Sequence, residues 1–182
     1  GLARLRRFAP HLQAIGLSAT VAEPDELRRW LVAQNPTGPM ADIITVEGGA
    51  KPEITILDTE ERVPWAGHQA HYAIPDVYEQ IKRHKTTLLF VNTRSQAEGL
   101  FQQLWHVNED NLPIALHHGS LDVGQRRRVE KAMEAGALRA IVATSTLDLG
   151  IDWGDVDLVV HVGAPKGASR LAQRIGRSNH RM

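Results

Sequence analysis

The chain has 182 residues, in which 21 Lys and Arg are balanced by 21 Asp and Glu, and it contains no cysteine. This length allows one domain, or one domain and part of another. Because the net charge is balanced, a site for a polyanion has to be local. The lack of cysteine excludes a disulfide framework, a thiolate metal site and a cysteine nucleophile. No apolar run reaches the roughly 18 residues that a membrane span needs, and no signal peptide opens the chain.

Strands and helices are predicted to alternate along the chain. It opens at Gly1 in what reads as a helix in progress, so we expect a fragment cut at both ends. The predicted strands are apolar, β-branched runs at Ala14–Thr20, Thr87–Thr93, Ile114–Gly119, Ala140–Thr144 and Leu158–Gly163. The predicted helices are Pro24–Ala33, Ile74–His84, Ser95–Asn108, Asp122–Ala135 and Ser169–His180. This alternation is typical of an α/β fold with a parallel sheet covered by helices on both faces.

Local signals mark the ends of these elements and one boundary. Pro24 suits the first turn of its helix, Ser95 and Glu98 have the spacing of a capping box, and Gly136 is expected to stop a helix. The stretch Pro36–Pro64 is rich in Gly and Pro and breaks the alternation. We therefore expect one α/β piece over residues 1–47, an extended linker over 48–66 and a larger α/β domain over 67–182.

Polar clusters follow four of the predicted strands. They are Ser18-Ala19-Thr20, Asn92-Thr93-Arg94-Ser95, His117-His118-Gly119-Ser120 and Thr144-Ser145-Thr146. Ligands of parallel sheets gather at the carboxyl ends of the strands, and hydroxyls and backbone N–H groups near helix starts suit phosphates. For any one cluster a helix cap is the simpler interpretation. Four such clusters favour a phosphate-binding edge.

Metal sites and acyl-transfer sites find no support in the sequence. His117 and His118 are adjacent on a predicted strand, so they point to opposite faces and cannot share a metal. The other histidines lack zinc-ligand spacing, and Asp152, Asp155 and Asp157 lack the glycine and closing glutamate of a calcium loop. No nucleophile-elbow motif is present. We predict no metal bound by this chain.

The closing QRIGRSNHRM places Arg174, Arg177, His180 and Arg181 on or near one helix. A guanidinium keeps its charge and forks onto phosphate oxygens, so arginines on a fixed helix suit the developing charge of phosphoryl transfer. A basic helix face in water is the alternative. The motif alone does not decide between them.

The order of these motifs resembles a known family. Ser18-Ala19-Thr20, LFVNTR at Leu89–Arg94, ATS with LGID at Ala143–Asp152, and QRIGR at Gln173–Arg177 are similar to motifs III, IV, V and VI of superfamily 2 helicases. Within that superfamily, the stretches PWAGH, LPIALHHGSL and LDLGIDWGDVDLVV resemble the Lhr-type DEXH-box DNA helicases, closest to the ligase-associated bacterial kind. The resemblance implies the end of a first RecA-like domain followed by a second RecA-like domain, truncated after motif VI.

The resemblance also implies roles for individual residues. Ser18 and Thr20 would couple the ATP site to the nucleic-acid site. The sugar-phosphate backbone of a bound nucleic-acid strand would be contacted by Thr93, Arg94, Ser120 and Thr144. Gly150 and Asp152 would approach ATP, with Arg177 as the arginine finger. In many relatives another arginine lies three residues after the equivalent of Arg177, whereas this chain has His180 there. The second cationic catalytic contact therefore stays open between Arg174, His180 and Arg181.

The phosphate-cradling motif G-x-x-x-x-G-K-[ST] and the sequence D-E-x-H are absent from the chain. The family carries them upstream, so ATP and Mg²⁺ would be held mainly by an upstream RecA-like half, and this chain alone is predicted to be inactive. The resemblance implies an ATP-driven motor on single-stranded DNA in the bacterial cytoplasm, active at the nucleoid in DNA repair, with a DNA ligase or nuclease as partner and no membrane. A helicase acting on RNA or RNA–DNA hybrids and a non-catalytic nucleic-acid-binding module remain as alternatives.

Overall fold

The computed structural model describes residues 1–18, 21, 23–33, 37–45, 52–59, 71–147, 156–164 and 167–175. The chain divides into two compact units, Gly1–Gly48 and Gly49–Met182. The sequence placed its first boundary near residue 47. Its predicted linker runs on to residue 66, and residues 48–51 and 60–66 of that stretch lie outside the described residues.

The first unit contains two short helices, α1 (Leu2–Phe8) and α2 (Pro24–Leu31), with Pro24 in the first turn of α2 as expected. The Arg28 guanidinium joins α2 to the following segment, because its Nε donates to the Ala41 carbonyl at 2.6 Å. The predicted strand Ala14–Thr20 is wrong over its described part, since residues 13–18 form neither helix nor strand. Ile15 and Leu17 are 83% and 94% exposed. A strand of this kind needs neighbouring strands to pair with, and the described part of this unit supplies none.

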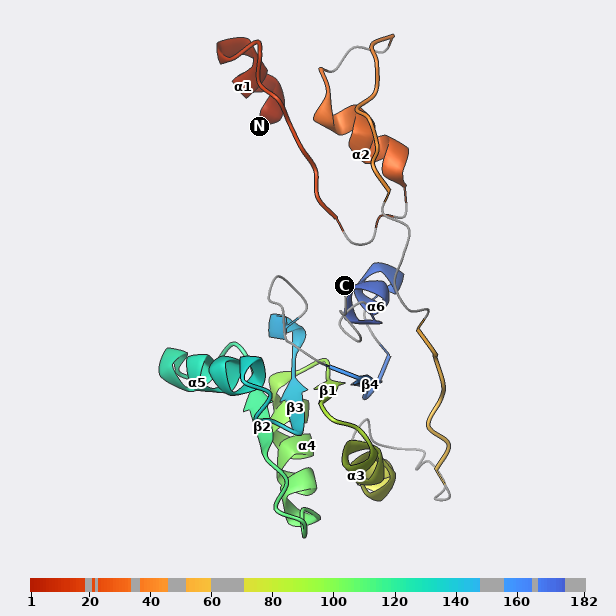
Figure 1. Ribbon diagram of the computed structural model, residues 1–182, viewed down its shortest axis with the longest axis vertical. Helices are drawn as coiled ribbons and strands as arrows, with labels where there is room; N and C mark the ends of the chain where they lie inside the picture. The colour runs from red at the N-terminus through yellow and green to blue at the C-terminus, as the bar shows by residue number, and fades with distance from the viewer. Residues whose placement is uncertain are drawn as a thin grey trace. The chain divides into compact units, whose positions relative to one another are not determined.

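The second unit is built around a parallel sheet in the order β2-β3-β1-β4. Figure 1 shows β3 and β1 in the middle of this sheet, with β2 and β4 at its edges. The strands are β1 (Thr87–Phe90), β2 (Ile114–His117), β3 (Ala140–Ala143) and β4 (Leu158–His161). Each lies within a predicted strand. All three pairings are parallel, so the four carboxyl ends meet at one edge of the sheet.

The helices of this unit match the predicted ones to within a few residues. They are α3 (Ile74–Arg83), α4 (Arg94–His106), α5 (Val123–Glu134) and α6 (Ala168–Ile175), with short 3-10 turns η1 (His71–Ala73) and η2 (Ser145–Leu147). Helix α5 ends as predicted, because Gly136 adopts a φ of 65°, a conformation that costs glycine little. The predicted extension of the last helix to His180 lies outside the described residues.

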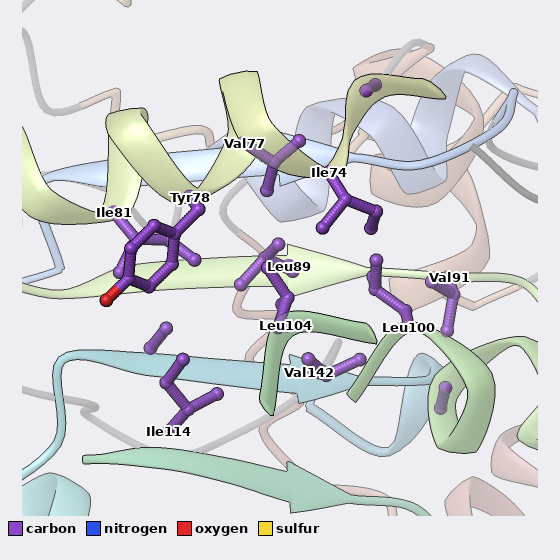
Figure 2. Packing of buried hydrophobic residues seen from close by; sticks show 13 residues of the cluster. Ile74, Val77, Tyr78, Ile81, Leu89, Val91, Leu100, Leu104, Ile114 and Val142 are labelled. Atoms are coloured by element: carbon purple, nitrogen blue, oxygen red, sulfur yellow. The ribbon is translucent and has the colours of Figure 1, made fainter. Parts of the chain in front are cut away.

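Two apolar layers enclose the sheet because alternate strand residues face opposite sides. On one side α3 and α4 cover Leu89 and Val142, and Figure 2 shows their side chains meeting between helix and strand. On the other side Leu88, Phe90 and Ile141 pack with Met133 of α5. This arrangement of helices on both faces is the α/β fold that the sequence predicted.

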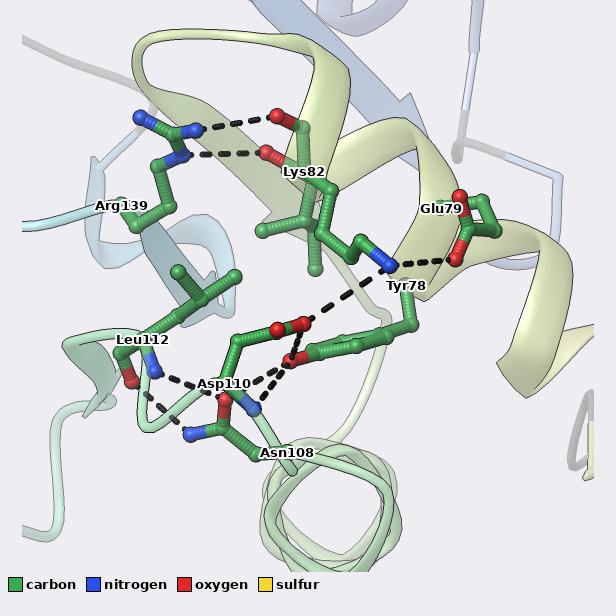
Figure 3. Close-up of polar contacts among 8 residues, drawn as sticks. Tyr78, Glu79, Lys82, Asn108, Asp110, Leu112 and Arg139 are labelled. Atoms are coloured by element: carbon green, nitrogen blue, oxygen red, sulfur yellow. Dashed lines mark hydrogen bonds and ion pairs between the residues drawn. The ribbon is translucent and has the colours of Figure 1, made fainter.

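At the edge of the sheet where the strands begin, side chains form hydrogen bonds that join α3 to the segments before β2 and β3 (Figure 3). The Tyr78 hydroxyl lies 3.0 Å from both Asn108 Oδ1 and Asp110 Oδ2, and its single proton is donated to one of them at a time. Burial, as the largest cause, raises the pKa of Tyr78. Arg139 donates to the carbonyls of Ile81 and Lys82, which are among the last carbonyls of α3 that have no partner within the helix. The polar groups of these residues are thus paired with one another and with the end of α3.

Candidate functional site

Three of the four predicted polar clusters meet at the carboxyl edge of the sheet. Main-chain hydrogen bonds align the strand ends, from Val91 N to the Ala143 carbonyl at 2.9 Å and from Thr144 N to the His117 carbonyl at 3.3 Å. The clusters after β1, β2 and β3 therefore lie side by side. The fourth cluster does not follow a strand of this sheet, because Ser18 belongs to the first unit. Ala19 and Thr20 of this cluster lie outside the described residues.

Thr93 begins α4 and has the geometry of a capping box. Its Oγ1 accepts from Gln96 N at 3.2 Å, and the Gln96 Oε1 accepts from Thr93 N at 3.1 Å. The predicted capping box at Ser95 and Glu98 is wrong in register by two residues. Since the Thr93 oxygen is an acceptor in the cap, its hydroxyl proton is available to a ligand oxygen.

Arg94, on the first turn of α4, is exposed and pairs with Glu98 one turn later. The guanidinium Nε donates to Glu98 Oε1 at 2.8 Å. This hydrogen bond is the largest cause that lowers the pKa of Glu98, and the charges of Arg94 and His118 lower it further. The carboxylate is therefore ionised at neutral pH. It uses one edge of the guanidinium and leaves the two terminal nitrogens for another acceptor.

Ser120 and Thr144 lie in the loops after β2 and β3. Ser120 is exposed and Thr144 is half-buried. A turn in which Leu121 N donates to the His118 carbonyl at 3.1 Å shapes the first of these loops. The structure thus brings four of the predicted backbone-binding residues to one edge, namely Thr93, Arg94, Ser120 and Thr144.

His117 supports the loop after β3, a role that the sequence did not reveal. Its ring Nδ1 lies 3.0 Å from Thr146 Oγ1 and its Nε2 lies 3.1 Å from Glu130 Oε1 on α5. Burial is the largest cause that lowers the pKa of His117. His118 faces α4 instead, with Nε2 3.4 Å from Glu98 Oε1. The prediction that the two rings point to opposite faces is confirmed.

Arg174 of α6 is buried rather than presented to solvent. Its Cζ lies 4.3 Å from the centroid of the Phe90 ring, and its Nη1 lies 3.4 Å from Nδ1 of His161. The Phe90 and His161 rings also stack, with centroids 5.7 Å apart. These contacts fasten α6 to the ends of β1 and β4.

The remaining predicted site residues cannot be placed. Thr20, Gly150, Asp152, Arg177, His180 and Arg181 lie outside the described residues. Within the described ranges, no three His, Cys, Asp or Glu side chains gather in a way that could hold a metal ion. The helices of the same ranges include none with the length and apolar character to cross a membrane.

Comparison with known proteins identifies the family and the fold of the second unit. The pattern of the helicase conserved C-terminal domain matches residues 71–181, which include every strand of the sheet. The chain belongs to this helicase family. Its second unit is a RecA-like helicase C-terminal domain, with the α/β fold and the four-stranded parallel sheet already described.

Longer helicases are similar to the whole chain. It is 36% identical to the ATP-dependent helicase Lhr-Core protein 2 of Thermococcus barophilus and 35% identical to the ATP-dependent helicase Lhr-Core of Methanocaldococcus jannaschii, in each case over 100% of this chain. It spans only 22% and 21% of those proteins, about a fifth of their length.

A solved helicase structure extends the similarity to three dimensions. The Mycobacterium smegmatis helicase Lhr, solved bound to single-stranded DNA and AMP-PNP, matches with a TM-score of 0.71 and 33% identity. The match covers 97% of this chain and 24% of that one. The helicase C-terminal domain here is therefore similar to part of a larger protein that was captured with both ligands.

Proposed function

We propose that this chain is part of an Lhr-type DEXH-box helicase that couples ATP hydrolysis to movement on single-stranded DNA. The observation that carries the proposal is the similarity, over 97% of the chain, to a helicase Lhr solved with single-stranded DNA and AMP-PNP. The first unit would be the end of the first RecA-like domain. The second unit would be the second RecA-like domain.

The side chains at the carboxyl edge of the sheet support a contact with the phosphate backbone of single-stranded DNA. The hydroxyls of Thr93, Ser120 and Thr144 and the guanidinium of Arg94 suit phosphate oxygens, and such groups fix a strand without reading its bases. Binding would be insensitive to base sequence and sensitive to salt, because phosphate contacts release counterions. Opening and closing of the cleft between two RecA-like domains would convert nucleotide binding into motion.

The nucleotide would be ATP with Mg²⁺, held mainly by the upstream RecA-like half of the protein. Gly150 and Asp152 would approach it from this chain, and Arg177 would stabilise the charge of the transferred phosphoryl group. Ser18 and Thr20 would couple the two sites. On the resemblance of its motifs to the ligase-associated kind, the protein would act in DNA repair with a ligase or nuclease, in the bacterial cytoplasm.

The decisive experiment measures ATP hydrolysis by the full-length protein, with and without single-stranded DNA. We expect DNA to stimulate turnover and Arg177→Ala to reduce it by about 10³-fold or more, the size of an arginine-finger effect. DNA binding should survive this change. Arg127→Ala is the control, because Arg127 is an exposed arginine of α5. Equal turnover in Arg177→Ala would remove the finger from the mechanism.

Further arms of the assay address substrate and cofactor. RNA and an RNA–DNA hybrid, tested beside DNA, would reassign the substrate if either stimulated turnover more strongly. Chelation of Mg²⁺ should abolish turnover. The 182-residue chain alone should hydrolyse no ATP, because it lacks both the phosphate-cradling loop and the D-E-x-H sequence. Absence of any DNA-stimulated turnover in the full-length protein would favour a non-catalytic binding module.

A further inference from the structure

One oxygen of Glu98 lies between two loops of the carboxyl edge. Glu98 Oε1 accepts from Arg94 Nε at 2.8 Å and lies 3.4 Å from His118 Nε2. Arg94 opens the helix after β1, and His118 opens the loop after β2. A single carboxylate oxygen therefore contacts both segments.

The sheet order makes this contact informative. Strands β1 and β2 are not neighbours, because β3 lies between them. No ladder hydrogen bond can therefore set the spacing between the loops that follow β1 and β2. Helix α4 packs against β2 and β3, and this brings Glu98 to His118. The side chain of Glu98 is thus a direct polar link between the two loops.

The ring nitrogens of His118 are buried and have few polar groups of the described chain near them. The residue is 2% exposed, and neither ring nitrogen makes a hydrogen bond within the part of the chain that the structure describes. A buried polar group without a partner is costly, and the polar contact that the structure gives this ring is the Glu98 carboxylate, whose Oε1 lies 3.4 Å from Nε2. Two residues after His118 comes Ser120, a proposed backbone contact.

Arg94 is held on one side only. Its Nε is bound to Glu98, and the guanidinium has no other partner among the described residues. Arginine binds phosphate best through a pair of nitrogens presented in a fixed plane. The hydrogen bond at Nε restricts the orientation of the guanidinium plane. It leaves the two terminal nitrogens for a phosphate oxygen of the bound nucleic acid.

We propose that Glu98 is a positioning residue for nucleic-acid binding, which orients the Arg94 guanidinium and, through His118, holds the Ser120 loop at the spacing of the strand backbone. This inference rests on the proposed function, since Arg94 and Ser120 act on the strand only if the edge binds one. Glu98 itself does not contact the strand.

The direction in which Glu98→Ala changes the affinity for DNA separates a positioning role of Glu98 from a passive one. An ionised carboxylate near a polyanion repels it, so removal of a passive Glu98 should strengthen binding. Removal of a positioning Glu98 should weaken it, because Arg94 loses its fixed plane. The affinity of Glu98→Ala for a single-stranded oligonucleotide therefore gives opposite results under the two interpretations.

The test uses the full-length protein and a fluorescent single-stranded oligodeoxythymidylate, titrated at several salt concentrations. We expect Arg94→Ala to weaken binding about tenfold and to flatten the slope of log K against log salt by about 0.7, the share of one phosphate on a single strand. Glu98→Ala should weaken binding about threefold to tenfold, as an unpositioned arginine would. Glu98→Gln, which keeps an oxygen acceptor for Arg94 Nε, should recover most of the affinity.

A double substitution and a matched control complete the design. In the Arg94→Ala background, Glu98→Ala should cause little further weakening, because its main target is already gone. The control is Glu79→Ala, which removes an exposed pair with Lys82 at 2.8 Å on α3, at the other edge of the sheet. It should leave DNA affinity unchanged.

The outcomes distinguish the two levels of the proposal. If Glu98→Ala binds DNA as well as or better than the native protein while Arg94→Ala binds weakly, the positioning role is wrong and the proposed function stands. If the native protein itself fails to bind single-stranded DNA, both fall. Weakening by Glu98→Ala that is recovered in Glu98→Gln and disappears in the Arg94→Ala background supports the positioning role, because a merely structural loss would not depend on Arg94.

Discussion

The guanidinium of Arg174 lies over the ring of Phe90, with Cζ 4.3 Å from the ring centroid, and Arg174 is 2% exposed. The sequence left Arg174 open as a candidate for a catalytic phosphate contact. Its contacts in the structure join α6 to β1 and β4. Arg174 would therefore act on the site by holding the helix that leads to Arg177.

The first prediction concerns the stability of this helix. Arg174→Ala should lower the free energy of unfolding by roughly 2 to 3 kcal/mol, because it removes a desolvated cation–π contact together with its packing. Arg174→Lys should recover only part of this loss, since an ammonium lacks the planar stacking group. Urea unfolding of the 182-residue chain, followed by circular dichroism, measures both. Arg127→Ala serves as the exposed control, and a native-like unfolding midpoint for Arg174→Ala would contradict the assignment.

The second prediction separates the two uses of Thr93. Thr93→Ala should lower the free energy of unfolding by about 1 kcal/mol, because the capping hydrogen bond is lost. Thr93→Asp should keep the cap, since aspartate is a good N-cap residue, yet weaken DNA binding because its charge repels phosphate. Unfolding midpoints and oligonucleotide affinities report the two effects separately. If Thr93→Asp bound the oligonucleotide with the affinity of the native protein, the DNA would not pass close to this residue.

The third prediction is a pH dependence of stability that arises from His117. Burial lowers the pKa of His117 in the folded state below the ordinary histidine value of about 6.5, hydrogen bonding to Glu130 opposes this shift, and the charges of Arg126 and His118 lower the pKa further. The unfolded chain therefore binds a proton more readily than the folded one. The stabilisation is fully present above about pH 6.5 and is lost as the pH falls toward the folded-state pKa.

The measurement for His117 compares unfolding free energies at pH 7.5 and at lower pH for the native chain and for His117→Gln. The variant should be less stable at pH 7.5, because glutamine does not reproduce both contacts to Thr146 and Glu130. Its stability should also fall less steeply on acidification. An unchanged pH profile in the variant would assign the acid sensitivity to another group.

Local patterns predicted the strands and helices of the second unit well, because buried runs and amphipathic periods depend on residues close in sequence. The helix start at Thr93 shows where such reasoning fails. Both Thr93 with Gln96 and Ser95 with Glu98 have the spacing of a capping box. The structure uses Thr93, since the Glu98 carboxylate is engaged with Arg94 and His118. One of these two contacts, to His118, comes from the loop after β2, which is distant in sequence.

The error at the first predicted strand has the same origin. The segment Ala14–Thr20 has the composition of a strand, yet strand formation requires neighbours that the described part of the first unit does not contain. On α4 the neighbouring residues Leu104 and Trp105 differ in burial, because Leu104 is fully buried whereas Trp105 is 59% exposed and stacks on Phe101. A helical pattern identifies residues near the core without deciding how far the packing extends.

The sequence by itself determined the alternation of strands and helices, the parallel sheet and the order of motifs that resembles superfamily 2 helicases. Each of these depends on neighbouring residues or on their linear order. Only the tertiary structure decided the strand order β2-β3-β1-β4, the burial of Arg174 on Phe90 and the meeting of Arg94, Glu98 and His118. These depend on contacts between distant segments, whose geometry is set by packing across the whole sheet.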